Sequence, residues 1–207
     1  MKKILFATGN ESKGKRFSNG LQKHNIEVIT LKDMGNTVDV LENGNTAIEN
    51  AIIKAKAYYD IYKMPTMAMD DTLYLSNVPL TKQPGLFVRR VNGKRLNDEE
   101  MLDHYINLVK EYGTNGKITA RWKYGLAIIN NDKISTYEWS KEDFFLTDKK
   151  SDKIHVGYPL DSISINKTLN KYFTDITVEE KELIKQNEDD VIDFIVKNFK
   201  DVENNDK

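Results

Sequence analysis

Short apolar runs alternate with amphipathic segments along the first half of the chain. Residues 3–7 have the pattern of a short buried strand, and the Lys-rich segment 12–24 carries Phe and Leu at helical spacing. Residues 26–31 alternate as a second strand. The strongest helical pattern covers 46–62, where apolar side chains recur every three or four residues behind a Thr-x-x-Glu capping box. This half is therefore predicted to fold as strand, helix, strand and helix.

The second half adds most of the expected strands. Residues 66–69 form a strand candidate that ends at two adjacent aspartates, and the pattern predicts a helix over 97–112. The remaining expected elements are a hairpin of strands 118–129 and 134–139 joined by Asn-Asn-Asp-Lys, further strand within 154–165, and closing helices at 178–186 and 189–199. Because strands and helices are mixed throughout, the predicted fold class is α/β.

Composition and charge narrow the range of functions. The 207 residues carry 31 Lys and Arg against 32 Asp and Glu, a formal net charge of −1, which argues against general nucleic-acid binding. The absence of cysteine excludes a disulfide scaffold, a thiolate zinc site and a cysteine nucleophile. No apolar run approaches the roughly 20 residues that span a bilayer, so we expect a cytoplasmic protein without membrane contact. We expect one domain over 1–200 and a polar tail at 201–207.

The segment 8–13, TGNESK, has the residue types of a phosphate-binding turn. It lies between an expected strand and an expected helix, where Gly9 permits a sharp turn and close backbone approach. A helix N-terminus offers unpaired N–H groups to a phosphate, and Lys13 adds a mobile positive charge. An ordinary strand–helix turn with a solvated lysine is the alternative for this segment.

Acidic residues in two further segments are candidate metal ligands. Glu42 precedes the long helix and could reach a metal, while Lys54 lies two turns into that helix and could reach a phosphate. Adjacent Asp70 and Asp71 point in different directions, so that one can bind Mg²⁺ while the other orients a ligand or water. Helix capping, a solvated lysine and turn formation are the structural alternatives. The three histidines show no metal-ligand spacing and are expected at surface or packing positions: His24, His104 and His155.

Taken in order, these segments resemble the inosine triphosphate pyrophosphatase family, also called HAM1-like. The family's Thr-Gly-Asn-x-x-Lys is matched at 8–13, and its Glu-x-Gly-x-Thr-x-x-Glu-Asn-Ala-x-x-Lys-Ala at 42–55. Pro-Gly-x-x-x-x-Arg is matched at 84–90 and Thr-x-Glu-Glu-Lys at 177–181. The family's Asp-Asp-Ser-Gly-Leu appears as Asp-Asp-Thr-Leu at 70–73, and Ala-Arg-Trp at 120–122 resembles its Ala-Arg-Phe. The resemblance therefore covers most of the chain.

The resemblance implies both a fold and a reaction. The fold would be elongated and two-lobed, with a central curved mixed β-sheet flanked by helices, and the protein would be a homodimer. A nucleoside triphosphate would lie between the lobes and be hydrolysed between its α- and β-phosphates, with Mg²⁺, to the monophosphate and pyrophosphate. The implied substrates are deaminated purine nucleotides such as ITP, dITP and XTP.

Position by position, the resemblance also assigns roles to residues of this chain. Asp71 would be the catalytic base and a metal ligand. Many relatives place a second metal-binding acid at the position of Leu41, so the adjacent Glu42 is expected to replace it. The residues expected to bind substrate are Thr8, Gly9, Asn10, Lys13, Lys54, Asp70, Thr72, Arg90, Gly157, Tyr158 and Lys181. The cationic residues among them are expected to converge with the acids on one cleft.

Two segments depart from the family pattern where the base would be recognised. The family's Phe-Gly-Tyr-Asp-Pro reads Val-Gly-Tyr-Pro-Leu at 156–160, which displaces the acid to Asp161 and keeps Tyr158 as a stacking face. The family's Ser-His-Arg reads Lys-Gln-Asn at 185–187. These changes motivate a second hypothesis, a catalytically weak or inactive nucleotide sensor that acts with an effector protein. A hydrolase for another modified or pyrimidine triphosphate is the third.

Overall fold

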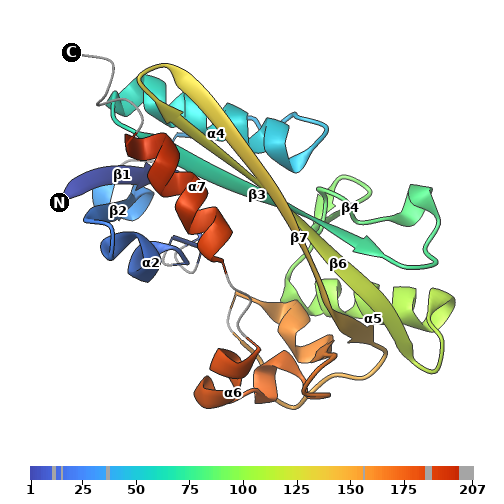
Figure 1. Ribbon diagram of the computed structural model, residues 1–207. Coiled ribbons are helices and arrows are strands. Elements are labelled where there is room, and N and C mark those ends of the chain that lie inside the picture. The colour runs from blue at the N-terminus through green and yellow to red at the C-terminus, as the bar shows by residue number, and fades with distance from the viewer. Residues whose placement is uncertain (11–12, 15, 36–37, 156, 185–187, 201–207) are drawn as a thin grey trace. The chain divides into compact units, whose positions relative to one another are not determined.

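The computed structural model describes residues 1–10, 13–14, 16–35, 38–155, 157–184 and 188–200 (Figure 1). The chain forms two compact units. Unit 1 comprises Met1–Asp71, Tyr124–Trp139 and Asn187–Lys207, and unit 2 comprises Thr72–Lys123 and Ser140–Gln186. A six-stranded sheet has the strand order β2-β1-β3-β6-β7-β8, and a separate two-stranded sheet pairs β4 with β5. This mixed sheet with its helices confirms the α/β fold class.

Parallel strands form the N-terminal part of the sheet in unit 1. β1 (Lys2–Phe6) pairs in parallel with β2 (Ile26–Thr30), with Ile4 opposite Val28, and also with β3 (Thr66–Leu75). The three apolar residues that end β1 are fully buried, as expected for a parallel strand covered on both faces. The helices that follow these strands are α2 (Ser18–Gln22), α3 (Leu31–Met34) and α4 (Ala47–Tyr62).

The long helix α4 packs a face of small residues against the rest of unit 1. A Cβ on Gly125 of β6 (Lys117–Asn130) would lie 2.6 Å from the Ile48 backbone nitrogen, so the strand passes directly against the first turn of α4. The Thr46 side chain caps the helix by accepting from the Glu49 N–H at 3.1 Å. The expected capping box is only half formed, because the Glu49 carboxylate accepts from the Asn45 N–H at 2.7 Å instead.

The C-terminal helix α7 (Asp189–Lys200) completes unit 1. It contacts α2, where a Cβ on Gly20 would lie 2.7 Å from the Ile192 Cδ1. Phe194 packs against Tyr137 of β7 (Lys133–Thr147), with ring centroids 5.1 Å apart. The Asn130 amide donates to the carbonyl of Phe199 at 3.1 Å. Unit 1 is therefore assembled from segments that are far apart in sequence.

Unit 2 is built around the amphipathic helix α5 (Asp98–Tyr112). Its N-terminus carries a complete capping box between Asn97 and Glu100. The buried face of α5 packs with residues of β3, β6 and β7 in one hydrophobic cluster that includes Tyr105, Phe144 and Ile163. The shorter elements are β4 (Arg90–Val91), β5 (Lys94–Arg95), β8 (Ser164–Asn166), α6 (Val178–Leu183) and three 3₁₀ turns at Leu80–Lys82, Pro159–Ile163 and Phe173–Asp175.

The observed elements correct the predicted extents of β3, of β7 and of the strand expected within 154–165. β3 does not end at the aspartates but continues to Leu75, and β7 continues to Thr147, because further buried apolar residues follow in each strand. Within 154–165 the expected strand is wrong for most of its length. Gly157 with φ of +83° and Pro159 at the start of a 3₁₀ turn leave only the short β8.

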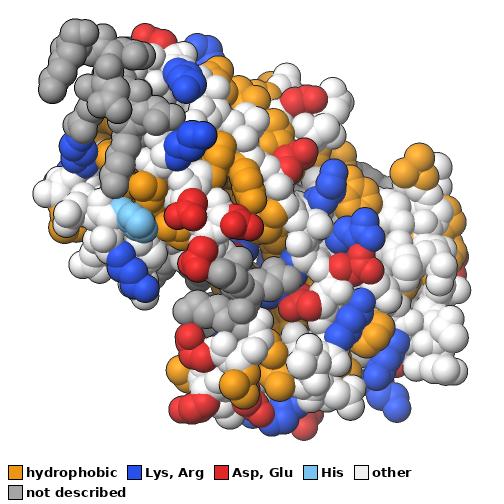
Figure 2. All heavy atoms as spheres, in the orientation of Figure 1, with side chains coloured by type: hydrophobic (Ala, Val, Ile, Leu, Met, Phe, Trp, Pro, Cys, Tyr) orange, Lys and Arg blue, Asp and Glu red, His pale blue; other side chains and the backbone are white. Residues whose placement is uncertain are grey.

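The surface shows no strong charge segregation on the face drawn in Figure 2, where acidic and basic side chains of the described residues are interspersed. The net charge of −1 fits this distribution. Among the described residues no helix is both long and apolar enough to cross a membrane.

Candidate active site

The turn after β1 is shaped by the side chains of Thr8 and Asn10. The Thr8 Oγ1 accepts from the Asn10 N–H at 3.1 Å, and the Asn10 Oδ1 accepts from the Lys13 N–H at 3.3 Å. The Asn10 carbonyl accepts from the Gly14 N–H at 3.0 Å. No atom lies within 4 Å of the position that a Cβ on Gly9 would occupy. The turn is therefore held by its own polar side chains, while the Gly9 backbone stays open to a ligand.

The two adjacent aspartates lie within β3 and have different partners. Asp71 forms an ion pair with the Lys13 ammonium group. Asp70 accepts from the Asn50 Nδ2 at 2.9 Å and from the Asp71 N–H at 3.0 Å. Burial raises the pKa of Asp70, while the Lys54 charge and these hydrogen bonds act in the opposite direction. The strand thus holds one carboxylate against a lysine and fixes the other by hydrogen bonds.

Asn50 connects this pair of acids to the loop before α4. Its side chain is only 5% exposed, and its Oδ1 accepts from the Gly44 N–H at 2.8 Å. A Cβ on Gly44 would lie 2.8 Å from that same oxygen, so the close approach requires glycine. Sequence reasoning gave Asn50 no role. The available signal was a polar residue at helical spacing on the buried face of α4.

A second lysine–carboxylate pair lies in the same unit. The Lys54 Nζ is 2.8 Å from the Glu42 Oε2. The charges of Lys54 and Lys13 both act on Asp70. Unit 1 therefore brings together these members of the predicted site: Lys13, Glu42, Lys54, Asp70 and Asp71.

The donors of this cluster suit a hard cation that also binds phosphate. Within the described ranges, no three His, Asp or Glu side chains gather closely enough to hold a metal ion. Mg²⁺ commonly uses one or two protein carboxylates and takes its other ligands from substrate phosphates and water. Asp71 and Glu42 supply carboxylate oxygens beside two lysines that can bind phosphate, so their chemistry fits Mg²⁺.

An arginine enclosed by aromatic rings was missed by sequence reasoning. The Arg16 Nε donates to the Glu188 Oε1 at 2.9 Å, and its Cζ lies 4.6 Å from the Tyr124 ring centroid. Phe17 and Trp139 approach the same guanidinium at 5.6 Å. Burial acts to lower the pKa of Arg16, but the Glu188 hydrogen bond and the nearby charges outweigh this effect, so the pKa is raised overall. Arg16 and Glu188 are 172 positions apart, so no local pattern could reveal the pair.

The other predicted site residues belong to unit 2. Thr72 is buried, and its hydroxyl donates to the Lys123 carbonyl at 3.4 Å. Tyr158 is partly exposed and follows Gly157 in a tight turn, and Lys181 lies on α6. Their convergence with the lysines of unit 1 on one cleft stays a prediction. The segment 185–187 lies outside the described residues.

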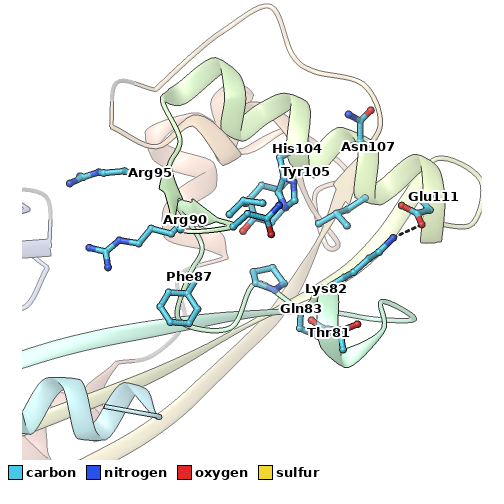
Figure 3. Close-up of a pocket in the computed structure, with 15 residues that line it drawn as sticks. Thr81, Lys82, Gln83, Phe87, Arg90, Arg95, His104, Tyr105, Asn107 and Glu111 are labelled. Atoms are coloured by element: carbon cyan, nitrogen blue, oxygen red, sulfur yellow. Dashed lines mark hydrogen bonds and ion pairs between the residues drawn. The ribbon is translucent and has the colours of Figure 1, made fainter. Parts of the chain in front are cut away.

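Arg90 lies at a cavity of about 790 Å³ in unit 2, lined by the β4–β5 hairpin, the turn at 81–84 and α5 (Figure 3). Arg90 and Arg95 are direct cross-strand neighbours and extend from the hairpin in the same direction. The Lys82 Nζ pairs with Glu111 at 2.7 Å on another side of the cavity. Substitution of Arg95 is therefore a matched control for substitution of Arg90, because both arginines extend from the same hairpin.

Comparison with known proteins identifies similar sequences and folds. A model of the Ham1 family matches residues 4–189. The chain is 28% identical over 190 residues to a dITP/XTP pyrophosphatase of Bacillus subtilis (strain 168), covering 91% of this chain and 93% of that protein. It is 30% identical over 189 residues to a dITP/XTP pyrophosphatase of Oceanobacillus iheyensis, covering 91% of each.

Two solved structures share the fold. The Ham1 protein of Staphylococcus aureus matches with a TM-score of 0.72 at 21% identity, covering 94% of this chain and 98% of that one. A HAM1 protein from Coxiella burnetii matches with a TM-score of 0.71 at 22% identity, covering 95% and 97%. These likenesses support the same α/β architecture.

Proposed function

Because the chain belongs to the Ham1 family, we propose that it is an acid-anhydride hydrolase that converts ITP, dITP and XTP to the monophosphate and pyrophosphate with Mg²⁺. The relatives named as dITP/XTP pyrophosphatases support this substrate class. The observation that carries the proposal is the cluster in unit 1, where Lys13 pairs with Asp71 and Lys54 pairs with Glu42 beside an open glycine turn. We further propose a cytoplasmic homodimer, as the family resemblance implies.

The lysines are proposed to bind the triphosphate. A phosphate oxygen competes with a carboxylate for an ammonium group, so substrate binding would draw Lys13 from Asp71 and Lys54 from Glu42. The exposed backbone at Gly9 leaves room for a phosphate to approach the turn. Each lysine would then neutralise charge that develops on the leaving pyrophosphate.

Asp71 is proposed to act as the base. Once released by Lys13, its carboxylate can accept a proton from the water that attacks the α-phosphorus. Asp70 is a positioning residue in this scheme, because its hydrogen bonds tie β3 to Asn50 and the loop at Gly44. Glu42 and Asp71 would hold Mg²⁺, which when bound supplies charge neutralisation and orientation of the phosphates.

The remaining assignments follow the resemblance. The phosphate-side residues would be Thr8, Gly9, Asn10, Thr72 and Arg90, and the nucleoside-side residues Gly157, Tyr158 and Lys181. Thr72 would act through its backbone or by supporting the strand, because its hydroxyl already donates to the Lys123 carbonyl.

We expect a triphosphate panel to show pyrophosphate release from ITP, dITP and XTP, with kcat/KM at least about 10-fold above that for ATP. Chelation of divalent metal should abolish this release, and excess Mg²⁺ should restore it, because the phosphate charge is otherwise incompletely neutralised. The measurement is a coupled pyrophosphate assay. Tight calorimetric binding of dITP without turnover would instead favour the sensor hypothesis, which the altered segment 156–160 motivates.

The contribution of Arg90 can be separated from the general charge of its hairpin. Loss of one charge-assisted hydrogen bond costs about 1.5–3 kcal/mol, so Arg90→Gln should raise the KM for dITP about 10-fold or more. Arg95→Gln removes the same charge from the paired position and should leave KM within about 2-fold, because an exposed charge without direct contact is screened. Equal effects of the two substitutions would contradict a direct contact by Arg90.

A further inference from the structure

His155 and Tyr158 present two rings from directly opposed positions. His155 and Tyr158 form an antiparallel bridge, in which the Tyr158 N–H donates to the His155 carbonyl at 3.0 Å. Gly157 has a φ of +83°, which suits the third position of a tight turn, and nothing lies within 4 Å of its Cβ position. Directly opposed residues of an antiparallel pair project to the same side. The imidazole and the phenol ring therefore leave the turn on one side.

Asp161 fixes the imidazole. The His155 Nδ1 lies 2.8 Å from the Asp161 Oδ2, and the Asp161 N–H donates to the Tyr158 carbonyl at 3.1 Å, so the acid is tied to the same turn. Burial raises the pKa of Asp161, while the hydrogen bond with His155 and the charges of Lys181 on α6 and Lys141 on β7 counteract this rise. These surroundings contain the cationic groups that favour an ionised carboxylate.

The pairing determines which hydrogen-bond function the imidazole offers. An ionised carboxylate only accepts, so Nδ1 carries the proton in the neutral ring and Nε2 presents a lone pair. A 6-keto purine such as hypoxanthine or xanthine has a hydrogen on N1, whereas N1 of adenine is itself an acceptor. The His155 Nε2 can therefore accept a hydrogen bond from the N1–H of hypoxanthine or xanthine. At adenine it would face the lone pair of N1 and could form no hydrogen bond there.

We propose that His155 is a specificity-determining residue, whose Nε2 accepts the N1–H of a 6-keto purine beside Tyr158, and that Asp161 is its positioning residue. This inference rests on the proposed function, which places the nucleoside at Tyr158 and Lys181. The chain thereby reads the base with a histidine that lies outside the expected set of site residues and with the acid that the altered segment displaces to position 161. Tyr158 supports the base through its ring face.

The test is the ratio of kcat/KM for ITP to that for ATP, measured by pyrophosphate release. Because His155→Phe removes the one hydrogen bond that distinguishes the two bases, it should lower the ratio about 10-fold or more, mainly through ITP. His155→Gln offers a carbonyl acceptor and should retain part of the preference. The control His24→Phe changes a histidine of unit 1 and should leave the ratio unchanged.

Asp161→Asn separates positioning from a purely structural role. The amide can donate to Nδ1 and so move the ring proton to Nε2, which removes the fixed acceptor. The ITP preference should fall while the unfolding midpoint remains that of the unmodified chain, and the ¹⁵N resonances of His155 should shift toward the Nε2–H tautomer. An unchanged tautomer with an unchanged ratio would overturn the role of Asp161.

The outcomes distinguish this inference from the proposed function. If the unmodified chain prefers ITP and His155→Phe keeps that preference, the inference fails and the proposed function stands. If the unmodified chain releases no pyrophosphate from any triphosphate, the proposed hydrolysis fails. Calorimetry with IMP and AMP then tests His155 directly. A preference for IMP that His155→Phe removes supports the inference, and equal affinities for IMP and AMP in the unmodified chain overturn it.

Discussion

Asp71→Asn is expected to lower kcat for pyrophosphate release from dITP about 10³-fold or more, since it removes both the proposed proton acceptor and a proposed metal ligand. Asparagine has nearly the same shape as aspartate, so the strand and the neighbouring Asp70 should keep their places. The substitution also leaves Lys13 without its carboxylate partner. Binding of dITP measured by calorimetry should therefore persist or tighten while turnover is lost.

Asp60→Asn is the control for this loss. Asp60 lies on α4 and pairs with Lys56 and Lys63 at 3.5 and 3.6 Å on the exposed side of the helix. Removing its charge should change kcat less than about 2-fold, because exposed ion pairs contribute little. An Asp71→Asn protein that retains full turnover would remove Asp71 from the mechanism, whatever the control shows.

Arg16→Met is expected to lower the free energy of unfolding by about 2–4 kcal/mol, because it leaves the partly buried Glu188 without its counter-charge and removes the guanidinium from the Tyr124 ring. Methionine keeps much of the side-chain volume, so the loss of charge dominates. Urea unfolding followed by circular dichroism measures the change. The double variant Arg16→Met with Glu188→Leu should recover part of the loss, since no unpaired charge remains.

The Lys82–Glu111 pair provides the comparison for Arg16. Its side chains are 49% and 53% exposed, so both charges remain hydrated when the pair is broken. Lys82→Met should leave the urea midpoint unchanged within error. An Arg16→Met variant as stable as Lys82→Met would show that the aromatic enclosure and Glu188 do not stabilise unit 1.

Local patterns were sufficient for the elements whose apolar spacing is regular. The helices α4 and α5 were predicted to within a residue or two, because each buries a continuous face behind a side-chain cap. The β6–β7 hairpin was also expected, although its loop is shorter than predicted. Asn131 and Asp132 both adopt positive φ, 47° and 61°, so a two-residue turn closes the strands.

Patterns failed where tertiary contacts overrode local signals. Two adjacent acids are typical of a strand end, yet β3 continues through Asp70 and Asp71, whose carboxylates find partners on other segments, to the buried Leu73 and Leu75. Such contacts between distant segments also explain why the sequence predicted the candidate active site only in part. Motifs identified the candidate lysines and acids. Lys13 lies 58 positions from Asp71, however, and no local pattern predicts which lysine pairs with which carboxylate. Asn50 and Arg16 acquire their roles only through such contacts.

The discontinuous make-up of unit 1 has a consequence for biosynthesis. The phosphate-binding turn at 8–13 is synthesised before α7, so Arg16 obtains its Glu188 partner and Gly20 its Ile192 contact only when α7 has been made. Domains that consist of one continuous segment can fold as they emerge. Here α2 lacks its contacts with α7 while residues 72–186 are being made, so chaperone dependence should be greatest in that interval.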